Sequence, residues 1–281
     1  MSKTRRQHII PRIYLKQFTS DGKRTYAYIR KLNTSKLLSI KDVGVKEHFY
    51  TVKHNILTPE HIEFQLSSKI EPLLGQCISS IIRYTETQQE RLNPSDICRA
   101  LICQYYRGVD FRKEINLITS IRVSLLHFLF SIDHRHYESL KNINAPMAHA
   151  YETFLNESLI ASRIKNILDY GEWSIMVSNQ HHFITSDRPV LSFCIIDKNE
   201  KKVYTKTDIG TPSSYIIMTI TPNILLQIRL HSSIQISIES IYHIPIVDAG
   251  ADYVKSINHL QLLNYDQQLY SKSPFNLQDI I

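Results

Sequence analysis

The spacing of hydrophobic residues changes twice along the chain, and this order of patterns restricts the fold more than any other feature. Short apolar segments of strand type occupy residues 1–54. Hydrophobic residues three or four positions apart, as on one face of a helix, recur over 59–168, and strand-type segments return over 172–281. Strands, then helices, then strands again is typical of an α+β protein, because a doubly wound parallel sheet needs strands that alternate with helices. We therefore predict an α+β fold with N-terminal strands, long central helices, a mostly antiparallel C-terminal sheet and a closing helix.

Nothing in the sequence divides these three regions into separate domains. No linker rich in Pro, Gly and Ser lies between them, so residues 1–281 are predicted to form a single domain. No apolar run reaches the roughly 20 residues that cross a bilayer, and the N-terminus lacks the apolar centre of a signal peptide. The four cysteines are scattered, which is typical of core residues in a reducing compartment. We predict a cytoplasmic protein without membrane contact.

Local signals place the first elements. After Pro11 we expect a short helix, and a turn at 20–23 precedes a hairpin of 25–29 with 37–40. A further short strand is expected at 49–51.

The central helices have their own start signals. Thr58-Pro59 begins the first, with a disruption expected at Pro72. Asn93-Pro94 begins the second, and a third runs from Ala145 to about Tyr170.

The C-terminal region reads as strands followed by a helix. Segments 173–177 and 182–185 are expected to pair as a hairpin around the turn at 178–180. Further strands are expected at 190–194, 215–219 and 224–228, and a last helix at 249–265 closes the chain.

Positive charge is concentrated at the N-terminal end of the chain. Residues 1–48 carry twelve Lys or Arg against three Asp or Glu, whereas the remaining residues carry 21 against 23. A local surplus of this kind attracts polyanions such as RNA or DNA. The alternative is a solvated basic face that only keeps the protein soluble.

The segment Gln7-His8-Ile9-Ile10-Pro11-Arg12 is the most distinctive in the sequence. A His that titrates near neutral pH can serve as a general acid, a general base or a metal ligand. We take His8 as a candidate catalytic residue, with Gln7 and Arg12 as candidate substrate-binding residues. The alternative is a structural His8 that binds a backbone carbonyl and holds the terminal segment against the core.

On the second predicted helix, Gln104 and Arg107 share a stripe that is otherwise apolar, so both are expected to point inward. A buried guanidinium needs a carboxylate, because an unpaired buried charge costs several kcal/mol. Asp187 is the first choice of partner, since it follows a strand in a Ser-Asp-x-Pro turn. Glu63 and Glu71 are the alternatives. The pair could also be purely structural.

Several separated motifs have a common order along the chain. They are Gln-His-x-x-Pro-x-x-Tyr-Leu-x-x-Phe from Gln7, Phe49-Tyr50, Gln104-Tyr105-Tyr106-Arg107, Ile184-Thr185-Ser186-Asp187-Arg188-Pro189, Asn258 and Tyr270-Ser271. With these motifs the chain resembles, over nearly its whole length, a bacterial family of unknown function numbered 4238. The resemblance implies a single bacterial domain in the cytoplasm and carries no assigned activity.

A site of His8, Arg107 and Asp187 would suit cleavage of nucleic acid. His8 would be the acid or base, Arg107 would clamp the phosphate, and Asp187 would orient one of them or hold a metal. Tyr50 and Gln104 would contact substrate. The hypothesis is a nuclease, with RNA favoured, and the family resemblance implies a toxin or phage-defence setting. The cofactor stays open between Mg²⁺ and none, no metal ligands are assigned, and no partner protein is identified.

Two rival functions fit the same residues. One is a non-enzymatic binding or regulatory module, in which the polar residues anchor the N-terminal segment. The other is an enzyme on a small molecule, which needs a closed, aromatic-lined pocket. An open cleft at His8 and Asp187 with basic residues around it would favour the nuclease, and burial of both would favour the module.

Two known nuclease motifs fit the sequence poorly. An HNH nuclease needs an Asn and a second metal ligand on a helix after the His, whereas Asn33 and His48 lie in a predicted turn and strand. A PD-(D/E)xK nuclease needs an acidic residue two positions before a Lys, and Asp197-Lys198 has the wrong order.

Overall fold

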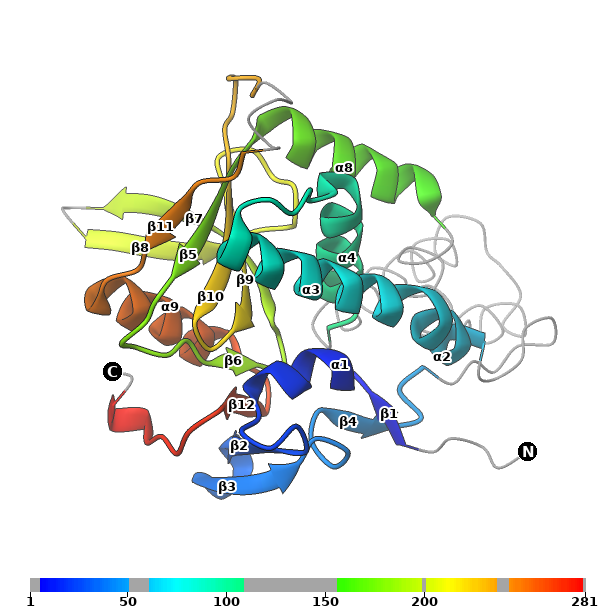
Figure 1. The fold of residues 1–281 in the computed structure, drawn as a ribbon, viewed down its shortest axis with the longest axis vertical. Coiled ribbons are helices and arrows are strands. Elements are labelled where there is room, and N and C mark those ends of the chain that lie inside the picture. The colour runs from blue at the N-terminus through cyan, green and yellow to red at the C-terminus, as the bar shows by residue number, and fades with distance from the viewer. Residues whose placement is uncertain (1–5, 51–60, 109–155, 199–200, 237–242, 280–281) are drawn as a thin grey trace, which may run out of the picture.

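The computed structural model describes residues 6–50, 61–108, 156–198, 201–236 and 243–279. Their fold is α+β, as the order of hydrophobic patterns predicts. Figure 1 shows a large sheet with helices packed against it, and a smaller group of strands from the chain's first and last parts beneath.

The large sheet has six strands, and most of them come from the predicted C-terminal β region. Their order across the sheet is β11 (Ile246–Asp248), β5 (Gly171–Val177), β10 (Ile224–Leu230), β9 (Tyr215–Thr221), β7 (Val190–Lys198) and β8 (Lys201–Lys206). Neighbours are antiparallel except for β11, which runs parallel to β5. The mostly antiparallel sheet is therefore confirmed, and β8 and β11 are strands that the sequence did not predict.

Helices cover both faces of this sheet (Figure 1). The elements α3 (Glu71–Thr87), α4 (Pro94–Tyr106) and α8 (Glu157–Tyr170) share one hydrophobic cluster with Ile216 and Met218 of β9. The closing helix α9 (Ala251–Asn264) shares the opposite cluster with Ile217. Alternate side chains of a strand point to opposite faces. Burial on both faces explains why β9 is apolar at nearly every position.

The smaller sheets join segments from both ends of the chain. A four-stranded antiparallel sheet has the order β3 (Thr34–Ser39), β2 (Arg24–Ile29), β12 (Gln268–Ser271) and β6 (Thr185–Ser186). Beside it, β1 (Arg6–His8) pairs antiparallel with β4 (Val45–Glu47). The predicted hairpin of 25–29 with 37–40 is confirmed, while the strand expected at 49–51 is wrong for Phe49 and Tyr50, which lie after β4.

The predicted helix after Pro11 is present as α1 (Arg12–Leu15), followed by a 3-10 turn at Lys16–Phe18. Further 3-10 turns lie at Arg30–Leu32 and Leu277–Asp279. Helix α1 approaches α3 closely at Gly75, where an added Cβ would lie 2.3 Å from Ile13 Cδ1. The small residue lets the opening segment pack directly on the first long helix.

The disruption expected at Pro72 occurs just before it. Helix α2 (His61–Gln65) continues into a π-helical segment at Leu66–Ile70, and α3 then begins with Pro72 in its first turn. Proline has no N–H to donate, and the regular α-helical pattern is interrupted just before it: Glu71 N donates to Leu66 O, five residues back, which is the hydrogen bond of a π-helix. Asn93 caps α4 as predicted, with its side chain accepting from Asp96 N at 3.3 Å. The expected helix starts at Thr58 and Ala145 lie outside the described residues.

The predicted hairpin of 173–177 with 182–185 is wrong. Strand β5 pairs with β10 and β11 instead. After the turn, Phe183 N donates to Pro222 O at 2.8 Å, and Ile184 N donates to the Asn258 side chain at 2.9 Å. These contacts lead the segment out of the large sheet and into β6 of the smaller one.

Two features of the described residues concern membrane insertion and the state of the cysteines. No described helix combines the length and the apolar character that a membrane crossing requires. The cysteines Cys77, Cys98 and Cys103 are buried with free thiols, as expected for core residues.

Candidate functional site

Arg107 forms the centre of the polar residues that the sequence singles out. It follows the last residue of α4, and its side chain is fully buried. Its Nε donates to the Tyr50 hydroxyl at 3.0 Å, and its Nη2 donates to Glu71 Oε1 at 2.8 Å and to the carbonyl oxygen of His8 at 2.5 Å. One guanidinium therefore joins the end of α4, the start of α3 and the opening strand β1.

The carboxylate that pairs with Arg107 is Glu71, one of the two alternatives, and the first choice Asp187 is wrong for this role. Glu71 is the first residue of α3, and about a quarter of its side chain is exposed (26%). Glu63 also lies in the field of Arg107: burial raises the pKa of Glu63, and the Arg107 charge opposes that rise. Arg107 points inward, as expected, but the carboxylate that pairs with it belongs to a helix, α3, rather than to the end of a strand.

Asp187 occupies a different place, next to β6. Its Oδ1 accepts from Asp266 N at 2.8 Å, and its Oδ2 accepts from Gln267 N at 2.6 Å and Gln268 N at 3.1 Å. Burial raises the pKa of this carboxyl, while the three backbone donors stabilise its charged form. The side chain is 4% exposed. Asp187 therefore fixes the turn between α9 and β12, and the structure does not bring it together with His8 and Arg107.

The predicted substrate-binding residues Gln7, Tyr50 and Gln104 are all buried. Gln7 Oε1 accepts from Tyr50 N at 2.5 Å, and Gln104 Nε2 donates to Ile9 O at 3.5 Å. Burial raises the pKa of Tyr50 to about 12, so its hydroxyl is neutral near pH 7. These contacts hold the opening segment against the core.

His8 lies at the edge of this buried group and is partly exposed. It ends β1, where it pairs with Val45 of β4, and its Nε2 lies 3.4 Å from Ile40 O. Burial lowers the pKa of His8, and the positive charge of Arg12 lowers it further. The imidazole is therefore neutral near pH 7 and can accept a proton.

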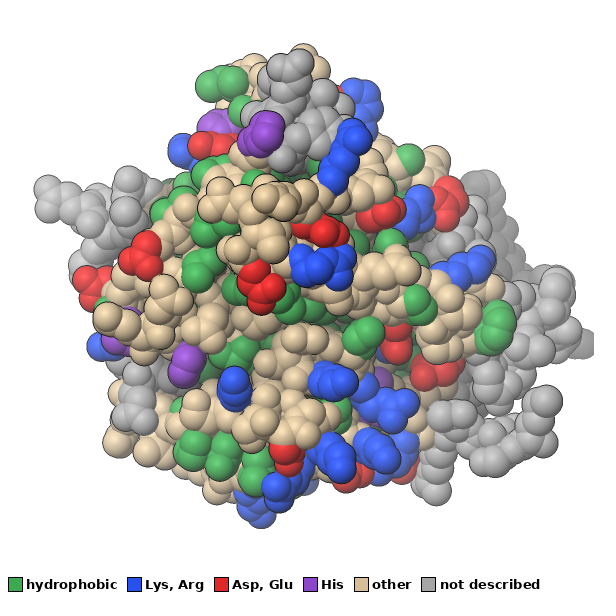
Figure 2. All heavy atoms as spheres, in the orientation of Figure 1, with side chains coloured by type: hydrophobic (Ala, Val, Ile, Leu, Met, Phe, Trp, Pro, Cys, Tyr) green, Lys and Arg blue, Asp and Glu red, His purple; other side chains and the backbone are tan. Residues whose placement is uncertain are grey.

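An open pocket of about 600 Å³ lies beside His8, and we call it the basic pocket. It is lined by Arg12, Ile13, Lys16, Gly22, Lys23, Ser39, Ile40, Lys41 and Glu71. The wall residue Ile40 is the one whose carbonyl meets His8. Four lining side chains are cationic, and the one carboxylate, Glu71, is engaged by Arg107. Figure 2 shows Lys and Arg gathered over this part of the molecule, where α1 and strands β2 to β4 lie.

A tight turn places Lys23 at the pocket. Gly22 has φ +71°, a left-handed conformation that favours glycine. Asp21 Oδ1 accepts from Lys23 N at 2.8 Å and from Arg24 N at 2.7 Å, which fixes the turn. The lysine is thus brought opposite α1.

The comparisons with known proteins decide the family. The model of one family, described as "Protein of unknown function (DUF4238)", matches residues 6–275. The chain belongs to this family. The match confirms the family that the sequence motifs indicate. No curated protein and no solved structure matches the chain significantly.

In this DUF4238 protein the sequence motifs serve mainly to join segments. Tyr14 illustrates this, since its hydroxyl lies 2.6 Å from Thr185 Oγ1 and donates to Thr219 O at 2.7 Å. Asn258 acts similarly, donating to His182 O at 2.9 Å while accepting from Ile184 N. No group of three or more His, Cys, Asp or Glu is placed to hold a metal within the residues that the structure describes.

Sequence reasoning did not single out three lysines of the basic pocket, namely Lys16, Lys23 and Lys41. The signal was present as the charge surplus of residues 1–48. Which of those cations meet around one pocket depends on the turn at Gly22 and on the hairpin of β2 and β3.

Proposed function

We propose that this DUF4238 protein acts on nucleic acid, with RNA favoured, by binding its phosphates in the basic pocket and cleaving the chain with His8 as acid or base. The observation that carries the proposal is the meeting of four cationic side chains around an open pocket whose wall touches His8. Lys and Arg neutralise backbone phosphates, and such binding is strongest where several cations follow one groove.

The proposed roles differ from those expected from the sequence. Phosphate binding falls to the cations of the basic pocket, because Arg107 is buried and engaged with Glu71. Arg107 instead fixes the backbone of His8 through its carbonyl oxygen. A neutral His8 suits a general base, which would take the proton of the ribose 2′-hydroxyl as that oxygen attacks the phosphorus. The bond from phosphorus to the 5′-oxygen would then break, water would protonate the leaving 5′-oxygen, and the product would be a 2′,3′-cyclic phosphate. The toxin or phage-defence setting is part of the same proposal.

A second candidate is a nucleic-acid-binding module without catalysis. The observation that favours it is the internal use of Gln7, Arg107 and Asp187, whose polar groups bind other parts of the fold. In this case the basic pocket would still bind phosphates, while His8 would only hold β1 to the loop at Ile40.

The test is an incubation of the purified protein with end-labelled RNA and with plasmid DNA, with and without Mg²⁺. The variants are His8→Ala and, as a matched control, His181→Ala, an exposed histidine near the turn after β5. We expect the wild type and His181→Ala to cleave RNA and His8→Ala to leave it intact.

Two outcomes would contradict the cleavage proposal. If His8→Ala cleaves as fast as the wild type, His8 is not the acid or base. If the wild type binds RNA without cleaving it, the second candidate takes its place. Thermal unfolding of each variant checks that loss of cleavage does not come from loss of the fold.

A further inference from the structure

Four cationic side chains line the basic pocket, and none of them has a carboxylate partner within the part of the chain that the structure describes. Three acidic residues lie in the lining or next to it in the sequence, namely Asp21, Asp42 and Glu71. Each forms its ion pair with an arginine that does not line the pocket, at 2.8 to 2.9 Å. The lining therefore keeps an uncompensated positive charge.

The four cations come from two segments that meet at the pocket. Arg12 and Lys16 are one helical turn apart, because Lys16 N donates to Arg12 O, so their side chains project on the same side. Strands β2 and β3 pair as far as their outer ends, which brings Lys23 and Lys41, the residues just beyond, close together. The side chain of Lys16 reaches the turn before Lys23, since an added Cβ at Gly22 would lie 3.6 Å from Lys16 Cε.

Like charges gathered in this way repel one another. One turn apart on a helix they lower its stability, and around one pocket the repulsion acts between all of them. An anion that carries several charges relieves more of this repulsion than an anion with a single charge. The lining therefore favours a ligand whose negative charges lie close together.

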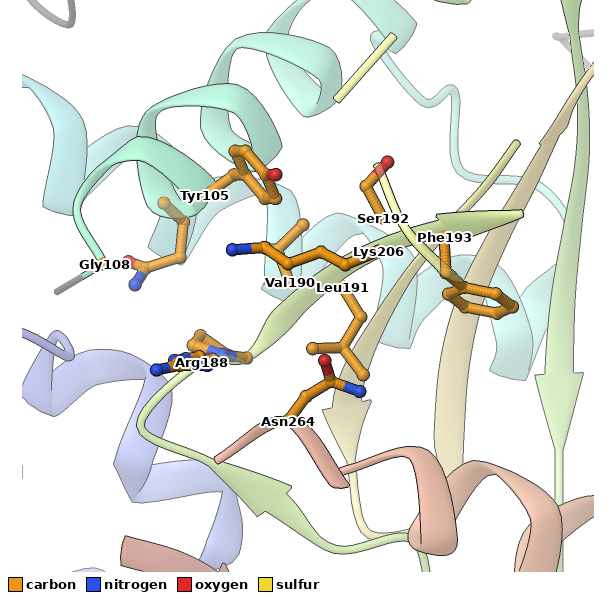
Figure 3. A pocket seen from close by; sticks show the side chains of 11 residues that line it. Tyr105, Gly108, Arg188, Val190, Leu191, Ser192, Phe193, Lys206 and Asn264 are labelled. Atoms are coloured by element: carbon orange, nitrogen blue, oxygen red, sulfur yellow. The ribbon is translucent and has the colours of Figure 1, made fainter. Parts of the chain in front are cut away.

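A smaller pocket beside the C-terminal end of α4 differs in both charge and size (Figure 3). It contains the cations Arg188 and Lys206, and both already have partners within the protein. Its volume is about 40 Å³, compared with about 600 Å³ for the basic pocket. Sites for small molecules and cofactors commonly have volumes of roughly 300 to 1,000 Å³. Of these two pockets, the basic pocket is the one with uncompensated charge and with room for a nucleotide.

The shape of the basic pocket distinguishes two classes of phosphate ligand. The internal phosphates of an RNA carry one charge each and follow one another along the strand, so they suit cations spaced along a groove. A triphosphate carries several charges on adjacent phosphorus atoms. It suits cations that surround one volume, as the four cations of the basic pocket do.

We propose that the basic pocket binds the triphosphate group of a nucleotide, either free or at the 5′ end of an RNA. Arg12 would bind two phosphate oxygens at once, and the lysines would contact further oxygens as point charges. Ile13, which lines the pocket and is 40% exposed, would pack against the first nucleoside. The inference rests on the proposed function, since it specifies which phosphates of the RNA the pocket holds, but it does not require cleavage by His8.

The test measures binding of one short RNA, labelled at its 3′ end and prepared with either a 5′-triphosphate or a 5′-hydroxyl. Its riboses carry 2′-O-methyl groups, so that attack by a 2′-hydroxyl is impossible and binding is measured without cleavage. In fluorescence anisotropy we expect the 5′-triphosphate RNA to bind at least about tenfold more tightly than the 5′-hydroxyl RNA. Inorganic tripolyphosphate should displace it at a concentration at which orthophosphate does not.

Competition by ATP distinguishes the two sources of the triphosphate. If ATP displaces the labelled RNA as effectively as the unlabelled 5′-triphosphate RNA does, the ligand is a free nucleotide. If ATP is the weaker competitor, the ligand is the 5′ end of an RNA. Both results support a triphosphate site.

The variant Lys16→Gln/Lys23→Gln locates the site, because both lysines are exposed and their replacement leaves the core intact. We expect it to weaken binding of the 5′-triphosphate RNA about tenfold. The matched control Lys31→Gln/Lys36→Gln removes two exposed charges of the same basic N-terminal segment, outside the pocket, and should change the Kd by less than about twofold. Thermal unfolding of each variant checks that its fold is intact.

The triphosphate inference is overturned if the two RNAs bind equally, or if both double variants weaken binding to the same extent. If the two RNAs bind equally and Lys16→Gln/Lys23→Gln alone weakens them, the pocket binds internal phosphates, and the proposed action on nucleic acid stands without this inference. If neither RNA binds at low salt, both proposals fail.

Discussion

Replacement of Arg107 by Met tests whether this buried guanidinium holds the opening segment to the helices. Met has a similar length and no charge, so the variant removes the hydrogen bonds to Tyr50, Glu71 and the His8 carbonyl while filling much of the space. We expect a large loss of stability, because three acceptors lose their donor at once.

The magnitude follows from the burial of the pair. Removing one partner of a buried ion pair costs roughly 3 to 5 kcal/mol. Water reaches part of Glu71, whose side chain is 26% exposed, which lowers the cost of its unpaired charge. Tyr50, which accepts from Arg107 Nε, is buried. We therefore expect a loss of about 4 kcal/mol, which corresponds to a fall in Tm of about 7 °C for a chain of this length.

Urea unfolding and thermal unfolding of the same samples give the two quantities. The matched control is Arg99→Met, on the same helix, since Arg99 pairs with Glu157 at 2.9 Å on the surface. That variant should lose less than about 1 kcal/mol. The double variant Arg107→Met/Glu71→Leu should be more stable than Arg107→Met alone, because it removes the unpaired carboxylate.

The reasoning would be refuted if Arg107→Met lost no more stability than Arg99→Met. It would also fail if Glu71→Leu, added to Arg107→Met, lowered stability further. Either result would mean that the Arg107–Glu71 contact does not carry the attachment of β1.

Three further predictions concern single residues of the same region. The pKa of His8 is lowered in the folded state from the usual 6.5, so the folded protein takes up a proton at His8 less readily than the unfolded chain does. The fold therefore loses stability as the pH falls below 6.5, and the drop in Tm between pH 7.5 and 5.5 should be smaller in His8→Gln than in the wild type. Asp187→Asn should lower the free energy of unfolding by about 3 kcal/mol in urea titrations, because three backbone N–H groups lose a charged acceptor, and a loss below about 1 kcal/mol would contradict this role. Tyr50→Phe should lower it by about 1 to 2 kcal/mol, since Arg107 Nε loses its acceptor, and an unchanged urea midpoint would show that water replaces the hydroxyl.

Elements with strong local signals could be predicted from the sequence. Asn93-Pro94 begins α4 because the Asn side chain and the missing proline N–H both suit a helix start. The apolar run of β9 predicts a buried strand, and the structure buries it between helices on both sides. These signals act within a few residues, so they do not depend on the rest of the fold.

Pairings between distant segments could not be predicted. Segment 182–185 has the composition of a strand, yet Asn258 of α9 and the backbone of Pro222 take its amides. Strand β12 forms only because β2 and β6 lie on either side of it. In both cases partners far along the chain decide the structure.

The candidate site was predicted in part. That Arg107 is buried and paired followed from its place on an apolar helix stripe, but the choice of Glu71 depends on where α3 begins. Asp187 stands at a strand end, a position typical of functional residues, and its oxygens instead bind the backbone of 266–268. A sequence motif identifies residues that the fold needs without showing whether the need is structural or catalytic.

The salt dependence of RNA binding tests most directly whether the basic pocket is the nucleic-acid site. For single-stranded RNA, each neutralised phosphate contributes a slope of about −0.7 in a plot of log affinity against log salt, so four cations predict about −3. The variant Lys16→Gln/Lys41→Gln should halve that slope, and the control Lys255→Gln/Lys272→Gln, with two exposed lysines outside the pocket, should leave it unchanged. Equal slopes for both double variants, or no binding by the wild type at low salt, would contradict the account.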